Sequence, residues 1–306
     1  MIRAPARQPG QALRRHRLTA RGRRQAHGWL FVLPSLALVT VFFLVPLGLM
    51  GWMSLNDWGL VGEARPVGLD NYSTLFADQR FVDALLFSIR FAVLVVPLIM
   101  LVGFGLGALV TSQRRGVAIF RSIYFLPLVI GYAAASYIWL WLFNGQIGLA
   151  NKVLTDLGVI SVPLQWFADP MLGFIAASSL VIWKTVGFSM VLFMGGLQSV
   201  PQDLRDAASV DGASRWQMLR YVTLPLMRNT TALVFVFAAI SCLLVFEPFF
   251  ILTKGGPGTS TVGVVQWIFG TSFYAFRLGY GAAASIVLLV LLLTFTSIQV
   301  RAFLRD

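Results

Sequence analysis

Long apolar stretches that carry almost no charge constrain this chain more than any other feature. A helix needs roughly 20 apolar residues to cross the hydrocarbon core of a bilayer. Six stretches reach that length: residues 29–53, 91–110, 122–143, 171–197, 230–253 and 278–300. Lys184 interrupts the fourth and Glu247 the fifth. Because lipid offers no partner to backbone polar groups outside a helix or a closed barrel, we predict an all-α polytopic membrane protein with six transmembrane helices.

Composition agrees with a chain whose main solvent is lipid. Only 12% of the 306 residues are charged, about half of the quarter that soluble domains use. A net charge of +12 would suggest nucleic acid in a soluble protein, but here the basic residues flank apolar stretches, so we expect a bilayer and no nucleic-acid partner. The single Cys242 excludes an internal disulfide, and His16 and His27 are too few for a metal site.

The basic residues also predict the orientation, because Lys and Arg collect in cytoplasmic loops. Under the six-helix topology, 17 basic residues fall on one side and 5 on the other. The richer side holds the basic tail, residues 1–27, with eight arginines, and both chain ends. We therefore predict cytoplasmic termini and a transmembrane domain over residues 28–306. The first apolar stretch is too long for the core of a signal peptide, so we expect an uncleaved anchor.

Residues 199–229, called the polar loop below, stand out between two apolar stretches on the predicted cytoplasmic side. Pro201 suits a first helical turn, and Asp203 favours a helix N-terminus. Gly212 interrupts the helix with a residue that tolerates positive φ, and Leu224-Pro225 ends the loop. We predict two short helices whose small apolar faces suit docking into a groove. The alternative is an ordinary loop helix that lies on the bilayer.

The polar loop resembles the signature of a known family. That signature is Glu-Ala-Ala, three residues, Gly, nine residues, then Ile-x-Leu-Pro, found in the permease subunits of binding-protein-dependent ABC importers. This chain has Asp206-Ala207-Ala208, three residues, Gly212, nine residues, then Val222-Thr223-Leu224-Pro225. The flanking sequences GGLQSVPQDLRDAASVDGASRWQ and ILTKGGPGTST are similar to the carbohydrate-type permeases. So are LFVLPSLALVTVFFLVPLG and FRSIYFLPLV, and the resemblance extends over essentially the whole chain after the basic tail.

The resemblance implies a type I ABC importer permease-like fold in a bacterial or archaeal cell (inner) membrane. It implies that the polar loop docks on a separate cytoplasmic ATPase through residues that share this segment: Asp206, Ala207, Ala208, Asp211, Gly212, Ala213, Trp216, Leu224 and Pro225. A phosphate-binding loop needs a Gly-Lys pair, which the sequence lacks. We therefore expect no enzyme and no cofactor in this chain, with ATP and magnesium on the partner ATPase. The other implied partners are a second permease, as a heterodimer, a second ATPase copy and an extracytoplasmic solute-binding protein.

An ionisable residue within a span is a candidate for the translocation path. Lys184 and Glu247 are the two such candidates considered, and Pro248 should weaken the helix beside Glu247. Trp183, Phe246 and Phe250 could stack on sugar rings. The alternatives are a lysine that snorkels to the interface or bonds a backbone carbonyl at a helix–helix contact, an interfacial acid that faces water, and lipid-facing aromatics. We expect no simple Lys184–Glu247 pair, because the two differ in depth.

The leading hypothesis is a permease subunit that imports a sugar or sugar-like solute. A permease for glycerol phosphate or a glycerophosphodiester is the alternative within the same importer class. A self-sufficient secondary transporter would need inverted repeats or several buried acids, and a membrane enzyme would need paired carboxylates or a His/Cys/Asp cluster. One membrane acid, no visible repeat and scattered acids argue against both.

Overall fold

The computed structural model describes residues 20–59, 62–111 and 116–304, with side chains over 29, 31–59, 62–111 and 116–302. The chain forms two compact units, which divide after Met50. The first unit holds helix α1 (Ala20–Val39), the π-helical turn η1 (Thr40–Leu44) and the start of α2 (Val45–Ser54). Residues 20–27 of the predicted basic tail are thus helical, and residues 1–19 lie outside the described residues.

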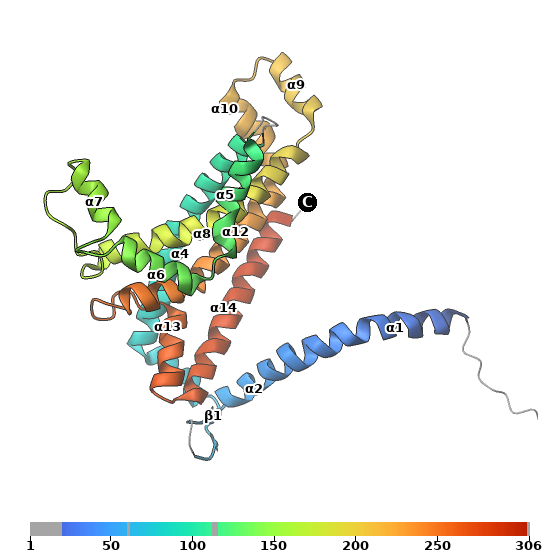
Figure 1. Cartoon of the computed structure of the whole chain (residues 1–306). Helices are drawn as coiled ribbons and strands as arrows, with labels where there is room; N and C mark the ends of the chain where they lie inside the picture. Colours follow the sequence, from blue (N-terminus) through green and yellow to red (C-terminus); the bar gives the residue numbers. More distant parts are fainter. Residues whose placement is uncertain (1–19, 60–61, 112–115, 305–306) are drawn as a thin grey trace, which may run out of the picture. The chain divides into compact units, whose positions relative to one another are not determined.

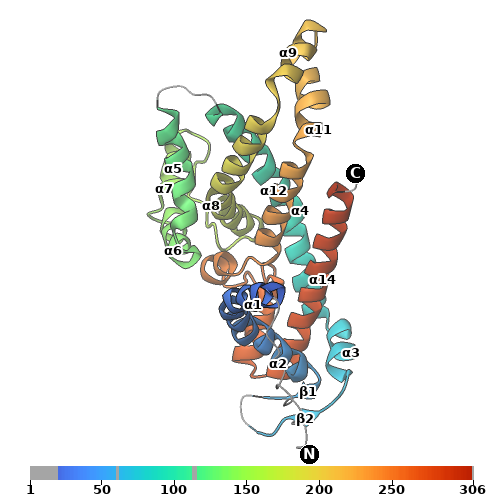
Figure 2. The same cartoon turned by 90° about the vertical axis from the view of Figure 1, so that its right-hand side faces the viewer.

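Four long helices run through the second unit: α4 (Gln79–Val110), α8 (Pro170–Ser199), α12 (Arg228–Leu243) and α14 (Leu278–Leu304). Helix α4 packs along both α8 and α12, and α12 also contacts α14. Helix α9 (Gln202–Val210) lies at one end of this unit, and strand β1 (Asn56–Asp57) and helix α13 (Val264–Phe269) lie towards the other (Figures 1 and 2).

Four helical stretches are each long and apolar enough to cross a membrane: Phe31–Ser54, Gln79–Val110, Pro170–Ser199 and Leu278–Ala302. Two bent pairs, one of which includes α12, raise the number of candidate spans to six among the described residues. The prediction of an all-α fold is therefore confirmed in its coarse form. The described residues also include a short antiparallel hairpin, in which β1 pairs with β2 (Arg65–Pro66).

The third predicted span, residues 122–143, is divided between two helices that form a bent pair. Helix α5 (Val117–Val129) and helix α6 (Tyr132–Leu142) meet at an angle of 102°. Pro127 lies in the last turn of α5, and Ile130 follows in an extended conformation with ψ of 128°. Hydropathy missed the bend because both helices are equally apolar, and apolar content carries no information on direction.

The fifth predicted span, residues 230–253, is also divided. Helix α12 ends at Leu243, and a π-helical turn, η3 (Phe249–Thr253), follows a short non-helical break. The break precedes Glu247 instead of lying at Pro248, because Pro248 starts the next helical turn, where its missing N–H costs no hydrogen bond. Upstream, α10 (Arg215–Gln217), η2 (Met218–Thr223) and α11 (Leu224–Leu226) form one helical run that meets α12 at 76°.

The second span begins 12 residues earlier than predicted, at Gln79 instead of residue 91. Asp78 caps α4 by accepting a 2.9 Å hydrogen bond from the backbone N–H of Arg80, and α3 (Asp70–Ala77) precedes it. The remaining elements lie near the end that carries β1 or in the loop after α6: α7 (Leu149–Asp156), α13 and the π-helical turn η4 (Gly270–Tyr274). Residues 79–90 are helical although they carry charged side chains. The Asp78 cap and the buried face of α4 stabilise the helix there, and hydropathy measures neither.

Two glycines allow α4 and α8 to approach closely. A Cβ atom at Gly103 would lie 2.8 Å from Cβ of Ser189, and one at Gly107 would lie 3.0 Å from Cβ of Phe193. The pair forms the Gly-x-x-x-Gly spacing that lets membrane helices pack backbone against backbone. Phe91 of α4 also makes edge contacts with Phe174 of α8 and with Phe249 of η3, with ring centroids 5.4 and 5.0 Å apart.

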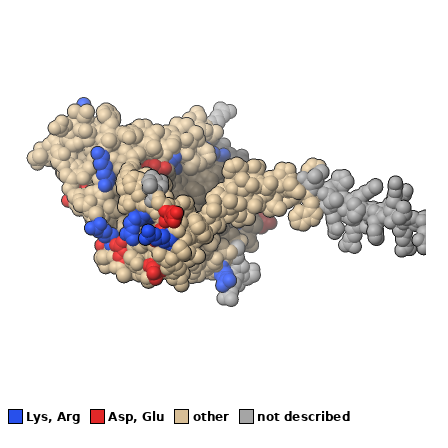
Figure 3. Space-filling model, turned by 90° about the horizontal axis from the view of Figure 1, so that it is seen from below, with Lys and Arg blue, Asp and Glu red and all other residues tan. Residues whose placement is uncertain are grey.

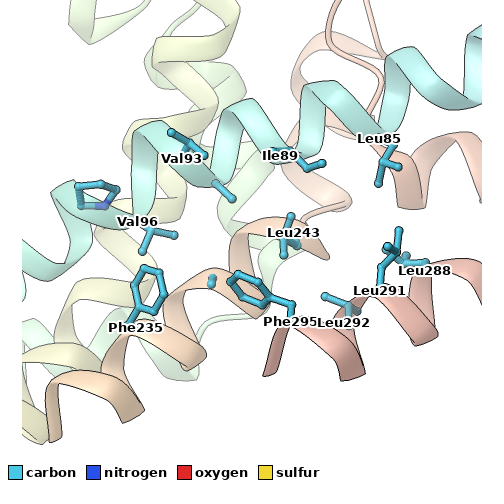
Figure 4. A pocket seen from close by; sticks show the side chains of 13 residues that line it. Leu85, Ile89, Val93, Val96, Phe235, Leu243, Leu288, Leu291, Leu292 and Phe295 are labelled. Carbon is cyan, nitrogen blue, oxygen red and sulfur yellow. The ribbon is translucent and has the colours of Figure 1, made fainter. Parts of the chain in front are cut away.

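An apolar groove of about 500 Å³ lies among α4, α12 and α14 (Figure 4). Side chains of all three helices line it, among them Ile89 and Val93 from α4, Phe235 from α12 and Phe295 from α14. All of its lining residues are apolar. This groove therefore offers nothing to hold a polar solute.

Candidate functional site

The polar loop begins with α9, which ends in a Schellman motif at Gly212. The N–H of Ala213 donates to the carbonyl of Ala208 at 3.0 Å, and the N–H of Gly212 donates to the carbonyl of Ser209 at 3.1 Å. Gly212 has φ of 77°, a left-handed conformation that side chains with a Cβ rarely adopt. The glycine is thus required by the backbone at this point.

The next helix, α10, begins at Arg215, and Ser214 before it forms a capping box. The Ser214 hydroxyl accepts a 3.3 Å hydrogen bond from the N–H of Gln217, and the Gln217 side chain accepts a 2.8 Å bond from the N–H of Ser214. Two orphan backbone donors are satisfied reciprocally in this way. Both short helices of the prediction are present, and the turn between them is closed by local hydrogen bonds.

The structure brings together some of the predicted docking residues and separates others. Ala208, Asp211, Gly212 and Ala213 line a shallow depression of about 310 Å³ together with side chains from η2. Ala207 is exposed on α9 beside it. The depression offers backbone and small side chains to a partner, as its alanines and glycine predict.

The other predicted docking residues lie outside that depression. Asp206 is exposed and accepts a 2.9 Å hydrogen bond from Gln202. Trp216 is 67% exposed on α10. Leu224 is half-buried and Pro225 exposed in α11, at the start of the bend into α12. An exposed tryptophan on a polar loop is a large apolar surface that no described residue covers.

Arg205 attaches α9 to the end of α8, a role that the sequence reasoning missed. Its Nη2 donates a 2.6 Å hydrogen bond to the backbone carbonyl of Leu197, one of the last carbonyls of α8. The signal was an arginine six residues after the end of α8, since basic side chains near a helix C-terminus can bond the orphan carbonyls. The hydrogen bond thus joins the polar loop to α8, one of the candidate membrane spans.

Lys184 lies buried on α8 against the bend between α5 and α6. Its Nζ donates to the backbone carbonyls of Pro127 and Leu128, at 3.2 Å each, and to that of Ile130. The same atom lies 4.7 Å from the ring centroid of Tyr132. These carbonyls lie at the C-terminus of α5, and that of Pro127 also accepts from the N–H of Ile130, so the ammonium group caps a helix C-terminus inside the fold.

Trp183 and Glu247 lie near this lysine. The Trp183 ring packs 4.8 Å from that of Trp139, whose indole N–H donates to Ser179 at 2.8 Å. Glu247 is half-buried and close enough to Lys184 and Tyr132 to interact electrostatically with both. No ion pair joins Glu247 to Lys184 in the described part of the chain.

Phe246 and Phe250 form a stacked pair with ring centroids 4.9 Å apart. Both also contact Phe269 of α13, at 5.2 and 5.6 Å. Phe250 lines a pocket of about 740 Å³, and Phe246 supports it from behind without lining the pocket. Among residues 20–59, 62–111 and 116–304, no group of three His, Cys, Asp or Glu side chains could hold a metal ion.

The sequence matches the family model described as "Binding-protein-dependent transport system inner membrane component" over residues 28–305. It is 32% identical over 283 residues to the trehalose/maltose transport system permease protein MalF of Thermococcus litoralis, covering 91% of this chain and 95% of that protein. It is also 32% identical over 279 residues to the sn-glycerol-3-phosphate transport system permease protein UgpA of Yersinia enterocolitica, covering 89% and 92%.

The fold is similar to that of a chain in the crystal structure of a bacterial alginate ABC transporter in complex with an alginate pentasaccharide-bound periplasmic protein. The TM-score is 0.78 at 22% identity, and the match covers 90% of this chain and 93% of that one. At this identity the likeness concerns the fold.

Proposed function

Because the chain belongs to the family of binding-protein-dependent transport system inner membrane components, we propose that it is the permease subunit of an ATP-driven importer for a sugar or sugar-like solute. Family membership makes it a transport subunit and not an enzyme. The Thermococcus relative is named for trehalose and maltose transport, which supports the carbohydrate class.

A glycerol phosphate importer is the second candidate. The Yersinia relative, which is named for sn-glycerol 3-phosphate transport, has the same 32% identity to this chain. Both candidates use the same importer architecture and differ in the charge of the solute. Overall sequence similarity does not distinguish the two candidate solutes, so the distinction must come from the residues of the candidate site.

The observation that carries the proposal is the polar loop. Its backbone is closed by a Schellman motif and a capping box, and it presents Trp216 and a depression centred on Gly212. We propose that this surface docks on a cytoplasmic ATPase that holds ATP and magnesium. Arg205 then transmits the movement of the docked loop to α8, so that the membrane helices switch as rigid bodies between two arrangements.

The complete importer would contain this chain, a second permease, two ATPase copies and an extracytoplasmic solute-binding protein. In this arrangement both termini and the polar loop face the cytoplasm of a bacterial or archaeal cell. The basic residues support that orientation, because they are concentrated on the side of the polar loop.

The experiment is a mild-detergent pull-down of this chain with identification of co-purifying proteins, run beside Gly212→Trp. We expect the wild-type chain to bring down an ATPase and a second permease, and the variant to lose the ATPase. Gly258→Trp is the matched control, because Gly258 also has positive φ, 63°, and also has open space around a Cβ position. Solute transport by the purified chain alone would instead support a secondary transporter.

A further inference from the structure

The pocket that Phe250 lines differs in chemistry from the rest of the membrane domain. It lies among α6, η3, α13, η4 and the first turn of α4, with a volume of about 740 Å³. Aromatic side chains form much of its wall: Tyr137, Phe250, Trp267, Phe269 and Tyr274. Two cations, Arg80 and Lys254, complete the lining with a few polar side chains. We call it the α13 pocket.

The aromatic wall is held in place and leaves two rings accessible. Phe269 packs 5.6 Å from Phe250 and 5.5 Å from Tyr274, which fixes the centre of the wall. Tyr137 and Tyr274 are 64% and 67% exposed. Rings that are rigid on one side and accessible on the other suit the apolar C–H faces of a sugar ring, while the phenol hydroxyls remain available for hydrogen bonds.

Neither cation of the α13 pocket is neutralised within the described part of the chain. The hydrogen bond found at Arg80 comes from its backbone N–H, so its guanidinium is not engaged there. Lys254 is exposed directly after η3, and no Asp or Glu lines the pocket. Figure 3 views the molecule from below, the side towards which β1 and α13 lie in Figure 1, and both basic and acidic side chains are visible on that face. Two unpaired cations on one pocket favour an anion.

Gln266 adds a polar group without a partner. Its Oε1 is buried and accepts no hydrogen bond within the described residues. Leaving a buried acceptor unsatisfied is costly, so such a group in a pocket wall indicates a missing donor. A hydroxyl group of a bound solute is a suitable donor.

From these contacts we propose that the α13 pocket binds a polyhydroxyl solute that bears one acidic group. The acidic group, a carboxylate, sulfonate or phosphate, lies between Arg80 and Lys254, and the hydroxyl-bearing frame packs on the tyrosines with one hydroxyl donating to Gln266. This inference rests on the proposed function and narrows it, because it favours acidic carbohydrate derivatives over neutral sugars.

The test compares matched pairs of probes that differ in one acidic group: glucuronate against glucose, and sn-glycerol 3-phosphate against glycerol. Binding to the purified complex in nanodiscs of zwitterionic lipid is followed by tryptophan fluorescence, to which Trp267 in the pocket wall contributes. We expect the acidic member of at least one pair to bind about tenfold more tightly than its neutral partner. The preference should fall as salt is raised, because exposed charges are screened.

The decisive variant is R80Q/K254Q, in which the preference for the acidic probe should disappear. The matched control is R65Q/K152Q, which removes two exposed cations that do not line this pocket and should leave the preference unchanged. Equal binding of acidic and neutral probes by the wild type, or an unchanged preference in R80Q/K254Q, overturns the inference. So does the absence of binding by every probe.

Two further measurements separate the alternatives. Nanodiscs that contain anionic lipid test whether the cations hold a lipid headgroup instead of a solute, and loss of the acidic preference in them would overturn the inference. Co-purification of the ATPase and its ATP hydrolysis report on the proposed function independently. If the ATPase co-purifies and hydrolyses ATP but no acidic preference is found, only the inference about the α13 pocket is refuted. If ATPase co-purification and ATP hydrolysis are both lost, the proposed importer function is refuted.

Discussion

The Nζ atom of Lys184 on α8 lies 3.2 Å from the backbone carbonyl oxygen of Pro127 at the end of α5. The two residues are 57 positions apart in the sequence, so the contact fixes a helix bend from a different helix. Lys184 is thereby held by carbonyls of the bend, including those of Leu128 and Ile130, instead of extending into open space.

Replacing Lys184 by Met should destabilise the protein. The change keeps most of the side-chain volume but removes the Lys184 donor from the carbonyls of Leu128 and Ile130 at the end of α5, at a cost of roughly 2 kcal/mol. Thermal unfolding in detergent should show a lower Tm than for Lys152→Met, which removes an exposed lysine of α7. An unchanged Tm combined with lost uptake would instead assign Lys184 to the translocation path.

Replacing Gly103 by Ala should separate α4 from α8. The new methyl group would lie 2.8 Å from Cβ of Ser189, so the helices must move apart, and we expect a loss of about 1–3 kcal/mol. Gly105→Ala is the control on the same helix, because nothing lies within 4 Å of that Cβ position. Equal Tm values for the two variants would contradict the close approach.

Replacing Arg205 by Met should weaken the link between the polar loop and α8. The hydrogen bond to Leu197 is lost, while the docking surface around Gly212 stays intact. We expect the ATPase to co-purify as before but solute-stimulated ATP hydrolysis to fall severalfold. Arg220→Met, at an exposed position of η2, is the comparison. If both variants keep full stimulation, Arg205 does not transmit movement.

Replacing Asn151 by Ala should loosen the segment between α6 and α8. Its amide donates to the carbonyls of Gly145 and Leu164, and its oxygen accepts from the Leu164 N–H and the Trp166 indole. Losing all four bonds should cost roughly 3 kcal/mol. Limited proteolysis should cut this segment faster in the variant, and Asn151→Asp, which keeps the acceptor, should be intermediate. Identical cleavage rates would refute this role.

Replacing Ser214 by Ala should fray α10. Loss of the capping box costs about 1 kcal/mol, so the amide of Gln217 should exchange with solvent about fivefold faster. Hydrogen exchange followed by mass spectrometry measures this directly. Ser209→Ala, which removes an exposed hydroxyl bond within α9, should leave the exchange of α10 unchanged. Equal exchange rates of the Gln217 amide in the two variants would contradict the capping role of Ser214.

Sequence reasoning identified a mostly helical chain with several apolar candidate spans, because lipid selects composition directly. It also located Gly212, since a positive φ leaves few alternatives to glycine. It failed at the bend after Pro127 and at the end of α12, because both sides of each break are apolar and hydropathy does not encode direction. The close approach at Gly103 had a signal in the sequence, the Gly-x-x-x-Gly spacing with Gly107. Hydropathy does not weigh that spacing.

Contacts between distant residues were harder to predict than elements. The depth of Lys184 indicated a buried cation but not which carbonyls would surround it, since these belong to a bend that was itself unforeseen. The α13 pocket likewise combines Arg80 with residues from Tyr137 to Tyr274, 57 to 194 positions later. Such a combination depends on how the helices pack, and periodicity within one segment does not contain it.

The Schellman motif and the capping box of the polar loop have a thermodynamic consequence for recognition. Ordering the backbone of one residue costs roughly 1–2 kcal/mol in entropy. In this loop that cost is met when the chain folds, because the bonds at Gly212 and Ser214 are local to it. A protein that docks here meets a preorganised ligand, so a larger share of the contact energy appears as affinity.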